Sequence, residues 1–182
     1  MKLIIGLGNP GKEYIGTRHN AGFDAIDSLA GILNIKATRE ECFAVLGGNG
    51  SVVLAKPQTF MNLSGEAAVC LSKKFSATAK EIILLHDELD LPLGTIRVKQ
   101  GGGSAGHKGI QSCIEKLGTN EFTRIRIGIS AIDKKADTVS FVLSRFTKEE
   151  KEDYLKSIEQ AAMAAKLLLT ATVEEAMNRF NR

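Results

Sequence analysis

The chain of 182 residues is long enough to bury a core, and we expect a single domain over residues 1–182. With 43% hydrophobic and 25% charged residues it has the composition of an ordinary globular protein, and no apolar run reaches the length of a signal-peptide core or a membrane-spanning helix. The formal net charge of +3 favours a polyanionic partner only slightly, because a solvated surface explains it equally well.

The first predicted element is a buried strand at residues 2–7, which ends in the stretch GLGNPG with the spacing G-x-G-x-x-G. A loop with that spacing binds a dinucleotide when two further features are present. A helix must begin at the third glycine, and a second strand must end in an acidic residue about twenty residues after the glycines. Here KEYIGTRHN follows Gly11 without helical periodicity, and Asp24 and Asp27 fall inside the next predicted helix. We therefore expect a loop that presents side chains instead of binding a nucleotide: Asn9, Tyr14, Arg18, His19 and Asn20.

Strands and helices alternate along the rest of the chain. Apolar runs predict strands, the first two flanking GGNG as a hairpin, at residues 42–46, 52–55, 82–85, 95–99 and 123–130. Helical spacing predicts helices at residues 21–33, 64–75, 110–116 and 174–180, with a further long helix after a capping box at 147–150. Residues 57–63, 86–92 and 101–106 are expected to be loops. This alternation predicts an α/β sandwich with a central mixed, mostly parallel sheet flanked by helices.

The most informative polar residue is His19, which lies in an irregular segment near the end of the first predicted strand. Ligands bind at this edge of open α/β sheets, but a lone histidine is ordinarily a cap or an exposed residue, so it needs a partner. The stretch HDELD at residues 86–90 follows another predicted strand. Neighbours on a strand point to opposite faces, so His86 and Asp87 should not pair with each other, and one of them can face His19. A carboxylate on one imidazole nitrogen would leave the other nitrogen free as a base.

Three other features have plain structural interpretations. Asn62 and Ser64, in KPQTFMNLSG, are suited to capping a helix, and Ser64 lacks the G-x-S-x-G context of a serine hydrolase. The glycine-rich loop between Lys99 and Lys108 could bind phosphate or be a flexible surface loop, and the basic residues crowded around it favour nucleic acid modestly. Residues 86–90 are accompanied by no second carboxylate-rich motif, so a divalent metal is not favoured.

The three cysteines, Cys42, Cys70 and Cys113, form no C-x-x-C pair and are odd in number. A disulfide framework and a thiolate zinc site are therefore not expected, and a reducing cytoplasm is the expected location. Each cysteine lies among apolar residues, which favours packing over a nucleophilic role.

Together these clusters resemble the bacterial-type peptidyl-tRNA hydrolase family. The matching stretches are GLGNPGKEYIGTRHNAGF, KPQTFMNLSG, HDELDLPLG, GGGSAGHKG and FTRIRIGI with its following FVLSRF, in the family's order and spacing. The combination is highly specific, although no single piece is. The resemblance implies a cytoplasmic, usually monomeric enzyme without metal or organic cofactor, which cleaves the ester between a peptide and the terminal ribose of tRNA.

The resemblance also implies roles for the residues at the strand ends. By this likeness His19 is the general base that activates water, and Asp87 is the carboxylate that orients it. Asn9 and Asn62 match the two asparagines that position the substrate and the attacking water. Carboxamides suit this task because they can donate to a carbonyl oxygen as charge develops there.

Further residues match the parts of the family that bind substrate. Tyr14 matches an aromatic residue beside the 3′ end of the tRNA, and Lys99 and Arg126 match basic residues that bind phosphate at the acceptor end. The chain departs from the family at Lys108, where a third asparagine commonly follows the histidine of the glycine-rich loop. The amide contact of that asparagine with the peptide is therefore not expected, and the lysine could meet a phosphate instead.

Two other functions fit parts of the pattern. A non-catalytic RNA-binding relative would share the fold and the basic residues, but it would not need Asn9, His19, Asn62 and Asp87 together. A dinucleotide-dependent oxidoreductase would need the helix that does not follow GLGNPG.

Overall fold

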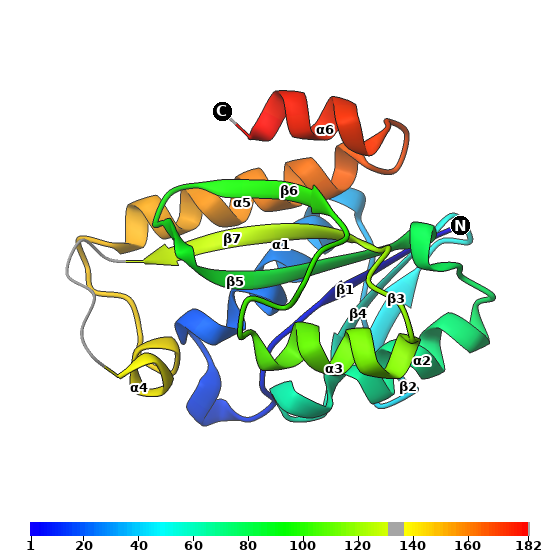
Figure 1. The fold of residues 1–182 in the computed structure, drawn as a ribbon, viewed down its shortest axis with the longest axis horizontal. Helices are drawn as coiled ribbons and strands as arrows, with labels where there is room; N and C mark the ends of the chain where they lie inside the picture. The colour runs from blue at the N-terminus through cyan, green and yellow to red at the C-terminus, as the bar shows by residue number, and fades with distance from the viewer. Residues whose placement is uncertain (131–136, 182) are drawn as a thin grey trace.

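The computed structural model of the chain describes residues 1–130 and 137–181 (Figure 1). Its framework is a seven-stranded sheet in the order β2-β3-β4-β1-β5-β7-β6. The strands are β1 (Lys2–Gly6), β2 (Arg39–Glu41), β3 (Ala44–Gly48), β4 (Val52–Pro57), β5 (Ile82–Pro92), β6 (Ile96–Gln100) and β7 (Thr123–Ser130). The four central strands β4, β1, β5 and β7 are parallel, and the pairs at both edges are antiparallel. The predicted mixed, mostly parallel sheet is confirmed.

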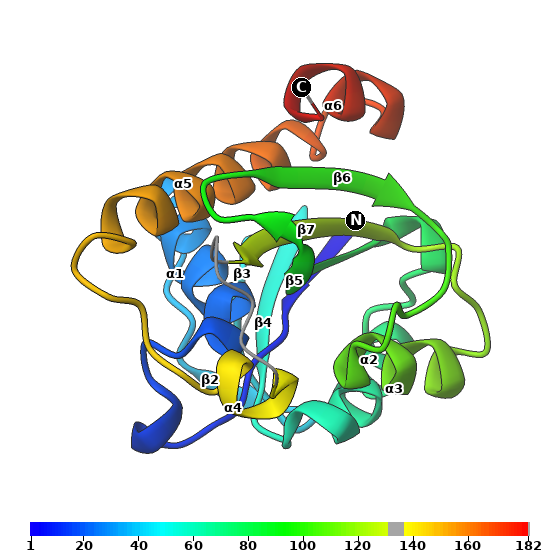
Figure 2. The ribbon, with the colours of Figure 1, turned by 60° about the vertical axis from the view of Figure 1, so that its left-hand side comes forward.

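Helices cover both faces of this sheet, as the two views show (Figures 1 and 2). The α-helices are α1 (Ala21–Leu33), α2 (Ser64–Lys74), α3 (Lys108–Leu117), α4 (Thr138–Val142), α5 (Lys151–Leu167) and α6 (Val173–Phe180). Short 3-10 turns are η1 (Lys12–Tyr14), η2 (Arg18–Asn20), η3 (Met61–Leu63) and η4 (Ala79–Glu81). No helix in these described ranges is long and apolar enough to cross a bilayer.

The core is divided by the sheet into two apolar layers. Ile4 packs with α1 and α5 on one face, whereas its neighbours Leu3 and Ile5 pack with α2 and α3 on the other. Because β1 is buried on both faces, it is apolar throughout, as a central parallel strand requires.

One predicted loop is wrong: residues 86–92 belong to β5. The strand lies between β1 and β7, and its ladder with β7 continues past Leu85 as far as the pairing of Pro92 with Ser130, with an irregular register after Glu88. The polar run HDELD is typical of a loop, but these polar side chains have bonding partners in the protein and therefore stay in the sheet. The short elements β2 and α4 were not predicted.

Of the two helix-capping predictions, the one for α2 is wrong and the one for α5 is confirmed. Neither Asn62 nor Ser64 caps α2 with its side chain, and the Ser64 hydroxyl instead donates to the carbonyl oxygen of Met61 at 2.8 Å. The capping box before α5 is confirmed: the Thr147 amide donates to the Glu150 carboxylate at 2.8 Å, and the Glu150 amide donates to the Thr147 hydroxyl at 3.3 Å.

Two glycines let α1 pack directly on the sheet. A Cβ on Gly22 would lie 2.3 Å from the carbonyl oxygen of Leu85, and a Cβ on Gly6 would lie 2.1 Å from the carbonyl oxygen of Gly22. These distances are shorter than any real contact, so side chains are excluded at both positions. The beginning of α1, and the turn η2 before it, are thereby held against the ends of β1 and β5.

The expectation that the chain has no disulfide is wrong. Cys42, in the turn between β2 and β3, is bonded to Cys70 on α2, with Cα atoms 5.3 Å apart. Only Cys113 remains free, and it is buried. The pair is separated by 28 residues, and the contact depends on how the hairpin packs on α2, which spacing alone does not reveal.

Replacing Cys42 with serine is expected to lower the free energy of unfolding by about 3–4 kcal/mol, the loop-closure contribution for a disulfide of this separation. Denaturant unfolding without reductant would measure it. Reductant should destabilise the wild-type protein to the same degree and leave the variant unchanged. Three titratable thiols in the unreduced, denatured wild-type chain would contradict the disulfide.

Candidate active site

A crevice of about 800 Å³ opens at the carboxyl ends of β1 and β5. Its polar lining comes from separate parts of the chain and includes Asn9, His19, Asn62, Asp87, Glu88, Asp90, His107, Lys108 and Thr138. Its apolar lining includes Phe60 and Met61 before α2, and Val139, Val142 and Leu143 in and after α4. Ligand sites in open α/β sheets form at this edge, where loops from neighbouring parallel strands meet.

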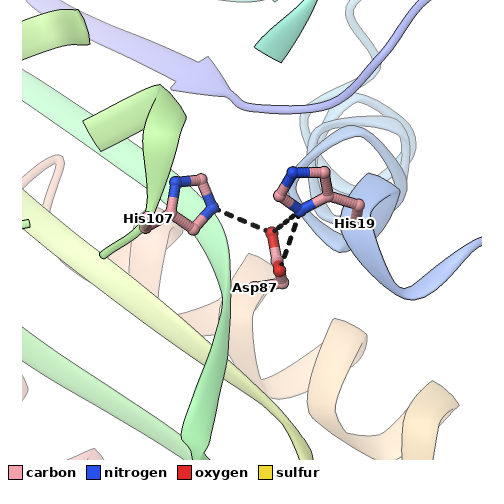
Figure 3. Close-up of side chains that lie close together, drawn as sticks. All are labelled: His19, Asp87 and His107. Carbon is pink, nitrogen blue, oxygen red and sulfur yellow. Dashed lines mark hydrogen bonds and ion pairs between the residues drawn. The ribbon is translucent and has the colours of Figure 1, made fainter. Parts of the chain in front are cut away.

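His19 and Asp87 meet in this crevice (Figure 3). The Nδ1 atom of His19, in η2, lies 2.9 Å from both carboxylate oxygens of Asp87, in β5. The prediction that these two residues come within bonding reach, 68 positions apart in the chain, is confirmed.

His107, which sequence reasoning assigned no role, bonds the same carboxylate from the other side (Figure 3). Its Nε2 lies 2.9 Å from Oδ1 of Asp87. Its Nδ1 accepts hydrogen bonds from the amides of Gly109 and Ile110 at 3.1 and 3.2 Å, and so caps α3. A nitrogen that accepts cannot carry a proton, so the ring proton of His107 lies on Nε2 and is donated to Asp87.

These contacts settle the ionisation of Asp87. Burial alone would raise the pKa of this carboxyl, but the hydrogen bonds and favourable electrostatics of His107, followed by those of His19, hold its pKa well below its usual range. The carboxylate is therefore an acceptor only, and the Nδ1–H group of His19 donates to it. The Nε2 atom of His19 is left with a free lone pair, which is the arrangement of a general base.

The neighbouring His86 is built differently. Its ring is buried, its Nδ1 donates to the backbone oxygen of Asp87 at 2.7 Å, and it makes a T-shaped contact with the ring of His107, with centroids 4.8 Å apart. Burial, and then His107, lower the pKa of His86 well below its ordinary value. As predicted, the side chains of His86 and Asp87 do not pair with each other.

Asn9 is held so that one end of its amide remains available. Its backbone exchanges hydrogen bonds with the Asn20 side chain at 2.9 and 3.0 Å, and its Oδ1 accepts from the Met61 amide at 2.7 Å. These bonds orient the side chain, and its Nδ2 donates to none of the described residues. A fixed N–H donor in the lining of the crevice suits an oxygen that gains negative charge.

Asn62 and Lys108 both line the crevice. Both also line a smaller polar hollow of about 420 Å³, which shares Gly106 with the crevice. Both side chains are exposed, and among the described residues neither makes a hydrogen bond or ion pair. They are therefore free to contact a ligand.

The three central groups could also be considered as metal ligands, because one ligand atom each of His19, Asp87 and His107 lie within 4.8 Å of one another. The donor chemistry does not fit a metal. A metal on Nε2 of His107 would leave both ring nitrogens without a proton, because Nδ1 accepts from the amides of α3. The cluster is instead satisfied by hydrogen bonds.

The basic residues lie on an adjoining part of the sheet. Arg97 is paired across the β6–β7 ladder with Arg126, and Lys99 is paired with Arg124. Like charges placed opposite each other destabilise a sheet unless other groups compensate them, and this ladder concentrates four cationic side chains. Arg126 is joined to the crevice through Glu88, whose carboxylate accepts from its Nε at 2.8 Å.

Arg124 has a different task from its neighbours. It is buried, and its guanidinium donates to the carbonyl oxygens of Gly101 and Gly103, with the bond to Gly103 at 2.7 Å. It thereby shapes the glycine-rich loop that leads to His107. Tyr14, in η1, is half-buried and is not among the residues that line the crevice.

Competing chemistries receive no support from the geometry. Ser64 is buried and its hydroxyl is bonded to a backbone carbonyl, and burial raises the pKa of the Cys113 thiol to about 12. Two short 3-10 turns, the first of which follows Gly11, separate this glycine from α1, so no α-helix opens on the third glycine of GLGNPG.

Sequence reasoning missed His107, Glu88 and the apolar wall from α4. His107 was recoverable in principle, because it is one of three histidines and directly precedes a helix. Glu88 was hidden by the mistaken loop. The α4 wall approaches the crevice only through packing between distant segments.

Comparison with known proteins gives one consistent result. The family model described as peptidyl-tRNA hydrolase matches residues 3–182. The chain is 46% identical over 188 residues to the peptidyl-tRNA hydrolase of Dehalococcoides mccartyi and 45% identical over 185 residues to that of Bacillus cereus, with 100% of this chain and of each relative covered. A crystal structure of peptidyl-tRNA hydrolase from Acinetobacter baumannii matches with a TM-score of 0.90 and 38% identity, covering 98% of this chain and 93% of that chain.

Proposed function

This chain belongs to the peptidyl-tRNA hydrolase family, and we propose that the crevice around His19 is where its reaction takes place. The enzyme hydrolyses the ester bond between a peptide and the 3′-terminal ribose of tRNA, which returns the tRNA to translation. The observation that supports this site is the bond of 2.9 Å between His19 and the Asp87 carboxylate, which leaves a basic nitrogen facing the crevice.

His19 is assigned as the general base. Its Nε2 takes a proton from water while the water oxygen bonds to the ester carbonyl carbon. The bond from that carbon to the ribose oxygen then breaks, and the imidazolium gives its proton to this oxygen, so that one water is divided between peptide and ribose. Asp87 stabilises the imidazolium in between, and His107 keeps Asp87 ionised and oriented.

Asn9 and Asn62 are assigned to the substrate. The free Nδ2 of Asn9 donates to the carbonyl oxygen as negative charge develops there, and Asn62 contacts the peptide backbone or the attacking water. Amides that contact only backbone groups do not distinguish peptide side chains. The site can therefore serve peptides of many sequences.

The basic residues of β6 and β7 are assigned to the tRNA. Lys99 and Arg126 contact phosphate near the acceptor end, and Glu88 orients Arg126 by occupying its Nε, which leaves its terminal nitrogens for the phosphate. Tyr14, outside the crevice, contacts the 3′ end of the tRNA. Such contacts supply affinity without sequence preference.

The remaining expectations become parts of this proposal. The chain acts as one domain over residues 1–182, as a monomer, in the cytoplasm where peptidyl-tRNA is produced, and without a metal or organic cofactor. The location no longer draws support from the cysteines, because Cys42 and Cys70 form a disulfide and disulfides are rare in the cytosol.

Lys108 gives a separate prediction. Its side chain lines the crevice together with Asn62, and an asparagine there could both donate to and accept from a peptide. Lys108→Asn is expected to lower KM for peptidyl-tRNA with little change in kcat. Steady-state kinetics on one N-blocked aminoacyl-tRNA would measure both values, and a raised KM would show that the lysine itself binds substrate.

The proposed site is tested with N-acetylated aminoacyl-tRNA, by following release of the blocked amino acid alongside a gel shift of uncleaved tRNA. The intact enzyme should release it, whereas His19→Ala should release it far more slowly and preserve the shift. A non-catalytic RNA-binding protein would shift the tRNA without release in either form. Undiminished release after loss of His19 would reject the assignment of the base.

A further inference from the structure

Arg18 is buried directly beside the proposed base, although it carries a charge. All three of its guanidinium nitrogens donate to the protein. Nε bonds the Ser144 hydroxyl at 3.1 Å, one terminal nitrogen bonds the Ile129 carbonyl at 3.3 Å, and the other bonds both oxygens of Glu150 at 2.8 and 2.7 Å. With its donors turned inward, Arg18 cannot contact tRNA, so any role it has in the reaction must act through other residues.

The same guanidinium also lies over two aromatic rings. Its central carbon lies 4.5 Å from the ring centroid of Phe141, in α4, and 4.4 Å from that of Phe146. The backbone adds to this junction, because the Arg18 amide donates to the Ser144 carbonyl at 3.0 Å and Thr17 forms an isolated bridge with Arg145. Arg18 thus joins η2 to a segment more than 120 residues later in the chain.

That later segment has two sides with different partners. Phe141, Ser144 and Phe146 hold Arg18, whereas their neighbours Val142 and Leu143 line the crevice. On the other side of the junction, the residue after Arg18 is His19. One side chain therefore fixes the spacing between the base and the apolar wall that faces it.

We propose that Arg18 is a positioning residue for the hydrolysis: it holds the His19 turn and the α4 wall in one arrangement, so that substrate lying against the wall meets Nε2 of His19. This inference rests on the proposed role of His19. It also assigns a task to Glu150, which is oriented by its bond to the Thr147 amide and receives Arg18 from the beginning of α5.

Arg18→Lys is the direct test, because lysine keeps the charge but has a single donor nitrogen and no planar group. It cannot hold Ser144, Ile129 and Glu150 together. A displacement of the base by about 1 Å can cost about 100-fold in rate. We expect kcat/KM to fall by about 10–100-fold, with kcat lowered by displacement of His19 and KM raised by displacement of the wall.

Glu150→Gln removes the charge of the same junction without changing the residue next to His19. It is expected to raise KM more than it lowers kcat, because the backbone bond from Arg18 to Ser144 remains. It also serves if Arg18→Lys does not fold. Cys42→Ser is the matched control, since it should lower stability far from the crevice and leave kcat and KM unchanged.

All variants are compared at a temperature where circular dichroism shows each to be fully folded. The acid limb of the pH–rate profile should keep its position, because Arg18 contacts neither Asp87 nor His107. Folded Arg18→Lys and Glu150→Gln with wild-type kcat and KM would reduce Arg18 to a stabilising residue, and a shifted acid limb would also overturn a positioning role. If instead His19→Ala stays active, the proposed function fails by itself, whatever the Arg18 variants do.

Discussion

Replacing His19 with alanine is expected to lower kcat for N-blocked aminoacyl-tRNA by about 10²–10⁴-fold, which is the usual contribution of a general base. The variant keeps Asp87 and its bond from His107, so the crevice retains its shape but has no nitrogen that can take a proton from water. KM should change little, because the residues assigned to tRNA phosphates, Lys99 and Arg126, lie on β6 and β7 and are unchanged in the variant. Single-turnover release of the blocked amino acid would measure the loss.

The same variant should also lose the acid limb of the pH–rate profile. In the wild-type enzyme this limb does not come from Asp87, because the pKa of Asp87 is held well below its usual range and Asp87 stays ionised. Residual activity of His19→Ala should therefore follow hydroxide concentration instead of levelling off. A retained wild-type pH profile would mean that another group acts as the base.

The meeting of His19 and Asp87 could be predicted because it depends on a rule about strand ends. His19 lies in the segment after one apolar run, and Asp87 directly follows another. Both runs are predicted to be parallel strands, and neighbouring parallel strands have their carboxyl ends at the same edge of the sheet. The sequence does not state that β1 and β5 are neighbours. Had another strand separated them, the two groups would be about 5 Å farther apart and would not bond.

The error at residues 86–92 has the opposite origin. The pattern of hydrophobic residues predicts which side chains are exposed to water. Polar residues therefore indicate a loop only when they are hydrogen-bonded to water and not to other parts of the protein. Here Asp87 is bonded by two imidazoles and Glu88 by Arg126, so polar side chains occupy buried strand positions. Strand reasoning fails at functional sites because the partners that make a polar strand possible are distant in sequence.

His107 shows how a small boundary error can hide a site residue. The predicted helix begins at residue 110, whereas α3 begins at Lys108 with His107 as its capping residue. When a histidine is predicted to lie in a loop, the sequence does not indicate which groups its ring nitrogens bond. A histidine that caps a helix with Nδ1 has its proton placed on Nε2, which then points to a single acceptor.

That fixed proton leads to the second prediction. In Asp87→Asn the new amide has one oxygen and one NH₂ group, and two rings compete for them. His107 can only donate, because the amides of α3 occupy its Nδ1, so it selects the amide oxygen. The NH₂ group must then face Nδ1 of His19, which becomes the acceptor and moves its own proton to Nε2.

Asp87→Asn should therefore leave every residue in place and still remove the base, because Nε2 of His19 now carries a proton at neutral pH. We expect kcat to fall by about 10³–10⁴-fold, the scale seen when an aspartate that sets a histidine tautomer is changed to asparagine. Imidazole ¹⁵N chemical shifts would report the tautomer directly, with Nδ1–H in the wild-type enzyme and Nε2–H in the variant. Asp24→Asn is the matched control, since Asp24 is a partly buried carboxyl bonded to Tyr154 outside the crevice lining, and its kcat should stay within about twofold. An inactive Asp87→Asn enzyme that keeps the Nδ1–H tautomer would show that Asp87 acts through its charge and not by placing the proton.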